Sequence, residues 1–321
     1  MTIKKVLYLL LVCLLFNSAI AEKPQLYIFL GGDSIQKHIS QINNKQVIGV
    51  QKIYTWKTLE TTKDHYNFSE IKSDIKLLKK HNKKLFIQLQ DRSFNVSNIP
   101  VPEYIKIKEY DNGIIIQSDN SSGGKPSYEG WVTKQWNVNV RHRFQKLIKQ
   151  LAKEFDGKIA GINLPETAID MNPKILTTKF CDDYFNAEVS NMLYARKEFK
   201  KSLVVQYVNF WPCEWNNSHG YMQKIFKIAE KNNIGVGNPD TLPYGKNQMH
   251  NSYPFFNKYK TKVFTTIAVQ EFDYDYINSK TSKKYTLSEL YDFDKNYIGA
   301  DIVFWTALYP QKLSYAAYLF K

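Results

Sequence analysis

The chain has 321 residues, 43% of them hydrophobic, and a formal net charge of +14 at pH 7. This length and apolar fraction suffice for one large core. The positive charge could attract nucleic acid, an anionic membrane or an acidic polysaccharide. The basic residues, such as Lys72, Lys76 and Lys79, are however scattered on predicted helix faces and form no aromatic-interleaved cluster. Solvated helix faces explain the charge better than a nucleic-acid site does, and we expect no nucleic-acid partner.

Residues 1–21 predict a secretory signal peptide. A basic start at Lys4-Lys5 precedes the apolar residues 6–16 and a small-residue site at Ala19-Ile20-Ala21. The apolar stretch is shorter than the ~20 residues of a membrane span, and no small residue precedes Cys13 as a lipoprotein would require. We therefore expect cleavage after Ala21, secreted or periplasmic localisation, and no integral membrane association for residues 22–321.

Eight short apolar runs alternate with helical or loop stretches along the mature chain. They are residues 26–30, 47–54, 85–90, 159–164, 203–210, 234–237, 263–269 and 302–305. Continuous apolar runs are typical of parallel strands buried on both faces, and eight of them with intervening helices can close into a (β/α)₈ barrel. No repeat or linker-like change of composition interrupts this pattern. We therefore predict the α/β class, a TIM barrel, and a single domain over residues 22–321.

Helical signals lie between the predicted strands. Asn67-x-x-Glu70 and Thr286-x-x-Glu289 both resemble capping boxes that begin helices. An apolar stripe from Phe144 to Phe155 predicts a helix that ends at Asp156-Gly157. Two connections are long, residues 91–140 and 238–262. Loops of this length are usually functional or disordered, and those at strand C-termini border the active face of a barrel.

Cysteines and histidines give little sign of a metal centre. Only Cys181 and Cys213 remain after the predicted cleavage. Export permits a disulfide between them, and two free buried thiols fit the sequence equally well. The six histidines show neither His-x-His nor HExxH spacing, so we expect no metal site and no cofactor.

Two of the predicted strands end in a glutamate. The fourth reads Ile159-Ala-Gly-Ile-Asn-Leu-Pro-Glu166 and the seventh reads Val263-Phe-Thr-Thr-Ile-Ala-Val-Gln-Glu271. Taken singly, Glu166 could be a helix-start acid and Glu271 a loop acid. Together they would face each other across the barrel mouth, where catalytic groups of this fold lie. Glycoside hydrolysis uses such a pair, one carboxyl as proton donor and one as nucleophile or base. Partial burial would raise the pKa of Glu166 towards that of a general acid.

Polar and aromatic residues at the other strand ends are candidates for sugar contacts. Amides and carboxylates bind hydroxyl groups, and aromatic faces pack against the C–H faces of pyranose rings. The candidates are Trp56, Gln88, Gln90, Asp91, Tyr207, Asn209, Trp211, Asn238, Asp240 and Trp305. Any one of them could instead be barrel packing, because a barrel interior consists mostly of layered apolar side chains.

The sequence resembles the retaining (β/α)₈ glycoside hydrolase clan. Its densest match runs from Tyr54-Thr-Trp56-Lys-Thr-Leu59-Glu60 to Tyr66-Asn-Phe68-Ser69, much as in the β-galactosidase-like branch, and Trp305 is typical of the eighth strand. The resemblance implies that Glu166 is the acid/base and Glu271 the nucleophile, with a carbohydrate as substrate. The segments INLPETAID and IAVQ are also similar to an uncharacterised family of exported bacterial proteins, from which no activity carries over.

Two departures from the clan pattern keep alternatives open. Pro165 occupies the place of the asparagine that usually precedes the acid/base, and Asn163 lies three residues before Glu166. Asp273 or Asp275 could serve as the nucleophile in place of the seventh-strand glutamate. Three hypotheses follow: a glycoside hydrolase, a carbohydrate-binding protein that has lost turnover, and a basic surface protein that binds host or envelope polymers.

Overall fold

The computed structural model describes residues 23–119 and 127–321. The predicted signal peptide and Cys13 lie outside the described residues. Within the described ranges, no helix is both long enough and apolar enough to cross a membrane.

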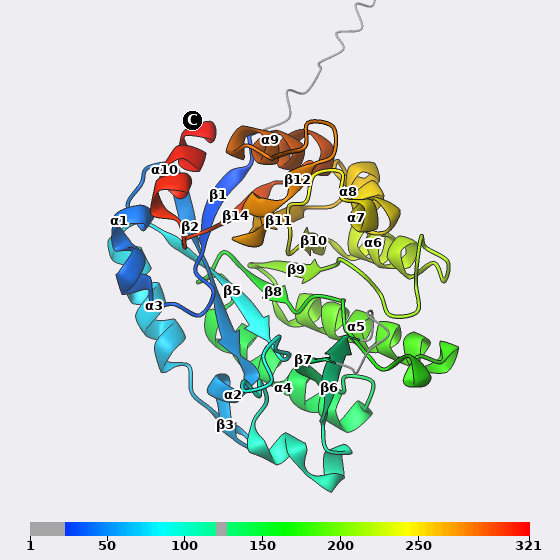
Figure 1. Ribbon diagram of the computed structural model, residues 1–321. Coiled ribbons are helices and arrows are strands. Elements are labelled where there is room, and N and C mark those ends of the chain that lie inside the picture. The colour runs from blue at the N-terminus through cyan, green and yellow to red at the C-terminus, as the bar shows by residue number, and fades with distance from the viewer. Residues whose placement is uncertain (1–22, 120–126) are drawn as a thin grey trace, which may run out of the picture.

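Eight parallel strands close into a barrel in which spatial order follows chain order (Figure 1). The strands are β1 (Gln25–Phe29), β2 (Val47–Thr55), β5 (Lys84–Gln90), β8 (Gly161–Leu164), β9 (Leu203–Tyr207), β10 (Gly235–Asn238), β11 (Thr265–Val269) and β14 (Ile302–Thr306). The ring closes where β14 pairs with β1, for example Leu26 with Val303. The predicted TIM barrel is confirmed. Both ends of every predicted strand lie within three residues of the ends of the observed strand.

Helices between the strands surround the barrel (Figure 1). They are α3 (Ser69–Lys80), α4 (Val138–Phe155), α5 (Thr178–Glu198), α6 (Tyr221–Asn232), α7 (Lys246–His250), α8 (Tyr253–Tyr259), α9 (Leu287–Asp292) and α10 (Pro310–Leu319). The stripe predicted for α4 is buried, from Phe144 to Phe155. The capping box of Thr286 and Glu289 is confirmed at α9. The box predicted at residues 67–70 is wrong, because Glu70 instead pairs with the buried Lys52.

Shorter elements fill the connections. These are α1 (Ile39–Ile42), α2 (Trp56–Leu59), a π-helix over Phe293–Ile298, and the strand pairs β3 (Glu60–Thr62) with β4 (His65–Tyr66) and β12 (Ile277–Asn278) with β13 (Lys283–Lys284). The long connection after β5 contains the antiparallel hairpin of β6 (Ile114–Asp119) and β7 (Ser127–Thr133). This hairpin joins the loop after β8, since Ser118 donates to the Asp170 carbonyl at 3.0 Å.

The interior of the barrel is a separate hydrophobic cluster made of strand side chains. It includes Tyr27, Phe86, Val205, Tyr207 and Phe304. The rings of Phe86 and Phe304 meet edge to face at 5.1 Å between centroids. A larger cluster contains outward-facing strand residues together with helix residues. The barrel is therefore filled and leaves room for a ligand only at its ends.

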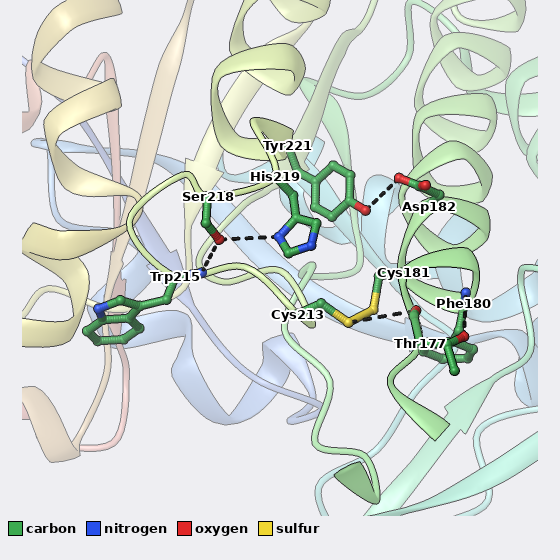
Figure 2. The surroundings of a disulfide bond; sticks show 9 residues. All are labelled: Thr177, Phe180, Cys181, Asp182, Cys213, Trp215, Ser218, His219 and Tyr221. Carbon is green, nitrogen blue, oxygen red and sulfur yellow. Dashed lines mark hydrogen bonds between the residues drawn. A yellow bond between two sulfur atoms is a disulfide. The ribbon is translucent and has the colours of Figure 1, made fainter. Parts of the chain in front are cut away.

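A disulfide joins Cys181 on α5 to Cys213 in the loop after β9 (Figure 2). Their Cα atoms lie 6.2 Å apart, within the usual range for such bonds. Beside it, the Tyr221 hydroxyl at the start of α6 donates to Asp182 of α5 at 2.6 Å. The disulfide thus links the loop after the fifth barrel strand to the helix that follows the fourth. Of the two alternatives that the sequence allowed, a disulfide or two free thiols, the structure contains the disulfide.

Candidate active site

A cavity of about 400 Å³ opens where the barrel strands end. Its lining residues come from strands β1, β2, β5 and β9 and from the loops after β5, β8, β10 and β11. They are Phe29, Ile53, Gln88, Gln90, Phe94, Glu166, Tyr207, Pro239, Asp240, Gln270 and Phe272. Five predicted site residues, Gln88, Gln90, Glu166, Tyr207 and Asp240, are therefore brought together.

Glu166 is partly buried in this cavity. The pKa of its carboxyl is raised to about 6. Burial raises it most and the nearby charge of Asp170 adds to this, while the Arg92 guanidinium and a hydrogen bond from the Asn209 amide act in the opposite direction. Burial therefore outweighs the two groups that favour the ionised form. A carboxyl with this pKa can be protonated in mildly acidic solution and then donate its proton.

Hydrogen bonds fix the backbone around Glu166. The Gln206 amide donates to the Pro165 carbonyl at 2.5 Å, and the Arg92 guanidinium donates to the Glu166 carbonyl. The Tyr184 hydroxyl donates to the Thr167 carbonyl at 3.1 Å. Side chains from β9, α5 and the loop after β5 therefore hold this segment, which keeps the carboxyl in one place.

Arg92 lies at the centre of a buried network behind the cavity. Its guanidinium is 3.3 Å from the Asp91 carboxylate, 3.1 Å from Glu188 and 3.0 Å from the Tyr184 hydroxyl. Gln135 donates to the other oxygen of Asp91 at 2.7 Å. Arg92 and Asp91 are both about 1% exposed. Arg92 therefore positions the Glu166 backbone, and Asp91, predicted to bind substrate, serves as its counter-ion.

Asp240 follows β10 and is the second carboxyl in this cavity. Gln270 donates to its Oδ1 at 3.3 Å and to the Pro239 carbonyl at 2.8 Å. Burial and the charge of Glu166 raise the pKa of Asp240 to about 8. The charge of Glu166 therefore acts on the Asp240 carboxyl in the same cavity and disfavours its ionised form.

Glu271 lines an adjoining cavity of about 450 Å³, which shares Phe29 and Gln270 with the first. Its side chain is exposed. Of the alternative acids, Asp273 is buried and accepts from the backbone N–H groups of Gln270 and Thr241, at 2.7 and 3.0 Å. Asp275 is exposed and pairs with Lys284 at 2.6 Å. Neither aspartate lines either cavity, so Glu271 is the seventh-strand acid that reaches the open end of the barrel.

Three aromatic residues predicted to bind sugar lie in the core instead. Trp56 and Trp305 are 0% exposed and Trp211 is 3% exposed. The indole of Trp56 donates to Glu60 at 2.8 Å, and that of Trp305 donates to the Tyr274 hydroxyl at 2.6 Å. The Trp211 ring packs on other aromatic rings of the α5 side. The structure gives these tryptophans packing partners and does not place them on the cavity.

Two predicted amides also have protein partners. Asn238 is fully buried and donates to the Val208 carbonyl at 3.0 Å. Asn209 donates to the Glu166 carboxylate, and its own side-chain oxygen accepts from Ala168 at 3.0 Å. Asn238 is thus structural, and Asn209 acts on Glu166 directly.

Two exposed aromatic rings at the edge of the cavity are not among the residues predicted from the sequence. Phe94 and Phe272 line it and are 54% and 48% exposed. Both follow a barrel strand by a few residues, Phe94 in a loop and Phe272 at the start of a short 3-10 helix (Phe272–Asp275). Large apolar side chains that remain exposed beside a cavity are typical of ligand-binding surfaces. Their position just after strand ends was the available signal.

No protein-family model matches the sequence, and no characterised protein resembles it significantly in sequence. Solved structures with a similar fold are glycoside hydrolases. A β-galactosidase from the haloarchaeon Halorubrum lacusprofundi aligns over 88% of this chain and 52% of its own, with a TM-score of 0.57 and 7% identity. One from Marinomonas ef1 covers 88% and 53%, with a TM-score of 0.54 and 8% identity. This chain spans about half the length of these two enzymes.

A third similar structure is endo-glycoceramidase II from a Rhodococcus species. It aligns over 89% of this chain and 75% of its own, with a TM-score of 0.52 and 7% identity. At these identities the likeness establishes the fold alone. The fold that they share with this chain is the (β/α)₈ barrel.

Proposed function

We propose that this protein hydrolyses a glycosidic bond of an oligosaccharide or polysaccharide in the cavity that contains Glu166. The observation that carries the proposal is a carboxyl at the end of the fourth strand, partly buried, with a pKa raised to about 6. Proton donors in glycosidases need such a raised pKa. Gln88 and Gln90 in the same cavity offer amide groups that bind sugar hydroxyls.

In this proposal Glu166 protonates the leaving oxygen and then activates water, and Glu271 forms the glycosyl intermediate. Glu271 reaches the reaction from the adjoining cavity, which shares Phe29 and Gln270 with the first. A sugar that spans both cavities would contact both glutamates. The retaining mechanism is proposed on the ground of the sequence resemblance.

A second candidate is a carbohydrate-binding protein without turnover. It is favoured by Pro165, which occupies the place of the clan's asparagine, and by Asn163, which is fully buried and donates to the Leu164 carbonyl at 2.9 Å. Neither residue offers a substrate the hydrogen bond that the clan makes there. Asn209 is hydrogen-bonded to Glu166, and its amide is therefore in the position most similar to that of the clan's asparagine.

We also propose that the protein is exported. The Cys181–Cys213 disulfide supports this, because such bonds persist in oxidising compartments. N-terminal sequencing of material recovered outside the cytoplasm should begin at Glu22. Retention of Met1 or a lipidated Cys13 would contradict it.

Leaving-group dependence tests the proposed hydrolysis. Glu166→Ala should lose about 10²–10⁴-fold in turnover of an alkyl glycoside, because the alkoxide then leaves unprotonated. An aryl glycoside with an acidic phenol should keep much of its first-step rate. Glu230→Gln, at an exposed position of α6, is the matched control and should behave as wild type.

Two outcomes would overturn the hydrolase. One is an unchanged rate on alkyl glycosides in Glu166→Ala. The other is saccharide binding by wild type, seen as a rise in melting temperature, with no turnover on a broad panel of α- and β-glycosides. The second outcome would establish the binding protein instead.

A further inference from the structure

The open end of the barrel is acidic although the chain as a whole is basic. The sequence holds 44 lysines and arginines against 30 acids, yet among the residues that the structure describes no lysine or arginine lines either cavity. Apart from the Tyr207 phenol, the ionisable lining residues are Glu166 and Asp240 in the first cavity and Asp33, His38 and Glu271 in the second. The lining of this site is therefore acidic in composition, in contrast to the basic composition of the whole chain.

Of the two carboxyls that line the first cavity, Asp240 is the less compensated, because Glu166 has the Asn209 amide and the Arg92 charge beside it. In the described part of the chain its carboxyl receives one hydrogen bond, from Gln270 at 3.3 Å, and no ion pair. Asp33, by contrast, pairs with Lys37 and His38, each at 3.1 Å. A buried carboxyl that faces a second carboxyl is costly to ionise without a cation. A positively charged ligand would offset that cost for Asp240 and Glu166 together.

Gln88 gives an independent sign of a ligand in the same cavity. Its side chain is 9% exposed, and its Oε1 is buried without a hydrogen-bond partner among the described residues. Leaving a buried amide oxygen unpaired costs free energy, and such groups are rare in folded proteins. A ligand that donates N–H or O–H hydrogen bonds would satisfy it.

We infer that this cavity is a subsite for an amino sugar whose ammonium group lies between Asp240 and Glu166, with a further donor bonded to Gln88. The inference rests on the proposed function, since it names the substrate class of the same site. An ammonium brings the missing positive charge and three N–H donors. The exposed rings of Phe94 and Phe272 border the cavity and suit the C–H faces of a pyranose.

Two other ligand classes fit the site less well. Within residues 23–119 and 127–321, no group of three or more His, Cys, Asp or Glu side chains is arranged to hold a metal ion. The cation is therefore expected to be organic. Sugars with carboxylate groups would meet Glu166 and Asp240 as like charges, so the basic exterior does not imply an acidic glycan in this cavity.

The test compares oligosaccharides that differ, within each set, only in the substituent at C2. The probes are tetramers of glucosamine and of galactosamine, each beside its N-acetylated form and its parent hydroxyl form. Affinity is measured by calorimetry at pH 7 and low salt, and cleavage by product analysis. We expect the free amine of at least one configuration to bind about tenfold tighter than its N-acetylated form, the scale of one charge-assisted hydrogen bond.

Asp240→Asn identifies the residue responsible. It keeps the size of the side chain but removes the charge, so the preference for the amine should fall to about threefold or less. Asp183→Asn, at an exposed position paired with Lys179, is the matched control and should keep the full preference. If Asp240→Asn still prefers the amine as strongly as wild type does, Asp240 is not the residue that binds the ammonium group.

The remaining outcomes separate the subsite from the proposed hydrolysis. Two results with the wild-type protein would overturn the subsite, whether or not Asp240→Asn folds. One is that the N-acetylated or hydroxyl forms bind as tightly as the amines or more tightly. The other is that neither amine binds. If the protein cleaves neutral glycosides and shows no preference for the amine, the subsite is overturned but the proposed hydrolysis stands. Tight binding of an amine that is never cleaved would support the subsite and contradict the hydrolase.

Discussion

Asn209 donates a hydrogen bond from its side-chain amide to Oε2 of Glu166, and its side-chain oxygen accepts one from the Ala168 backbone at 3.0 Å. The fifth-strand loop therefore holds both the carboxylate and the backbone that follows the fourth strand. A hydrogen bond donated to a carboxylate favours its ionised form. Asn209 thus lowers the pKa of Glu166, but burial raises it more, and the pKa that results is about 6.

We expect Asn209→Ala to raise the pKa of Glu166 further, because it removes a donor to the ionised form. A proton donor loses activity as the pH rises through its pKa, so the alkaline limb of kcat/KM should move up by about 0.5–1 pH unit. The measurement is a pH–rate profile with an alkyl glycoside. Asn139→Ala, at an exposed position of α4, should leave the limb in place. A shift to lower pH would show that the bond acts in the opposite sense.

Azide rescue assigns the nucleophile. Glu271→Ala should be nearly inactive with every leaving group, because no group then attacks the anomeric carbon. Azide can enter the space left by the truncated side chain and should restore turnover to a glycosyl azide of inverted anomeric form. Rescue of Asp240→Ala in place of Glu271→Ala would give the nucleophile role to Asp240, which shares the cavity of Glu166.

Sequence patterns predicted the barrel because strands buried on both faces must be apolar throughout, as in residues 263–269. They also predicted Glu166 and Asp240 on the cavity, because parallel strands end at one face. They could not show which way a strand-end ring points. Trp56 and Trp305 turn into the core, where Glu60 and Tyr274 accept their indole N–H groups.

Other parts of the site depend on contacts distant in sequence. Phe94 reaches the cavity from a loop whose path is set by the hairpin of β6 and β7. Ser93 at the start of that loop pairs with Trp131 of β7. No local pattern encodes such a pairing, which is why Phe94 was not predicted. The disulfide was left open for the same reason, since spacing alone does not fix the distance between two cysteines.

Breaking the disulfide should destabilise the fold. Cys181→Ser with Cys213→Ser removes a crosslink across 32 residues of sequence, and native disulfides typically contribute about 2–5 kcal/mol. Urea unfolding of the double variant, compared with wild type with and without a reducing agent, measures the difference. Reduced wild type should unfold like the variant. Equal stability in all three would mean that α5 and the fifth-strand loop stay together without the bond.

Removal of Arg92 should be more damaging than removal of a surface cation. Arg92→Met leaves the buried acids Asp91 and Glu188 without their counter-ion, at a cost of about 3–5 kcal/mol in the free energy of unfolding. Lys179→Met breaks an exposed pair with Asp183 and should cost less than about 1 kcal/mol. Urea unfolding compares the two. If both variants lose a similarly small amount of unfolding free energy, water reaches the network around Arg92.

The protonation of Asp240 links the site to stability. Folding raises the pKa of this carboxyl from its ordinary 3.8 to about 8. Between these values the folded chain holds a proton that the unfolded chain has lost, so the free energy of unfolding falls as the pH rises. The loss is complete above about pH 8, where both states are ionised. Asn at this position cannot ionise and should avoid the loss.

Asp240→Asn should therefore match wild type in stability near pH 4 and exceed it increasingly up to pH 8.5. The gain should be on the order of 1–3 kcal/mol, less than the full pKa shift implies, because the side chain is partly solvated. Urea unfolding at several pH values gives the difference. Asp183→Asn, whose carboxyl is exposed and paired with Lys179, should show no gain as the pH rises. If the variant is less stable than wild type at pH 8.5, the ionised Asp240 has a stabilising partner in solution. The cavity would then lack the uncompensated charge that an amino sugar is expected to neutralise.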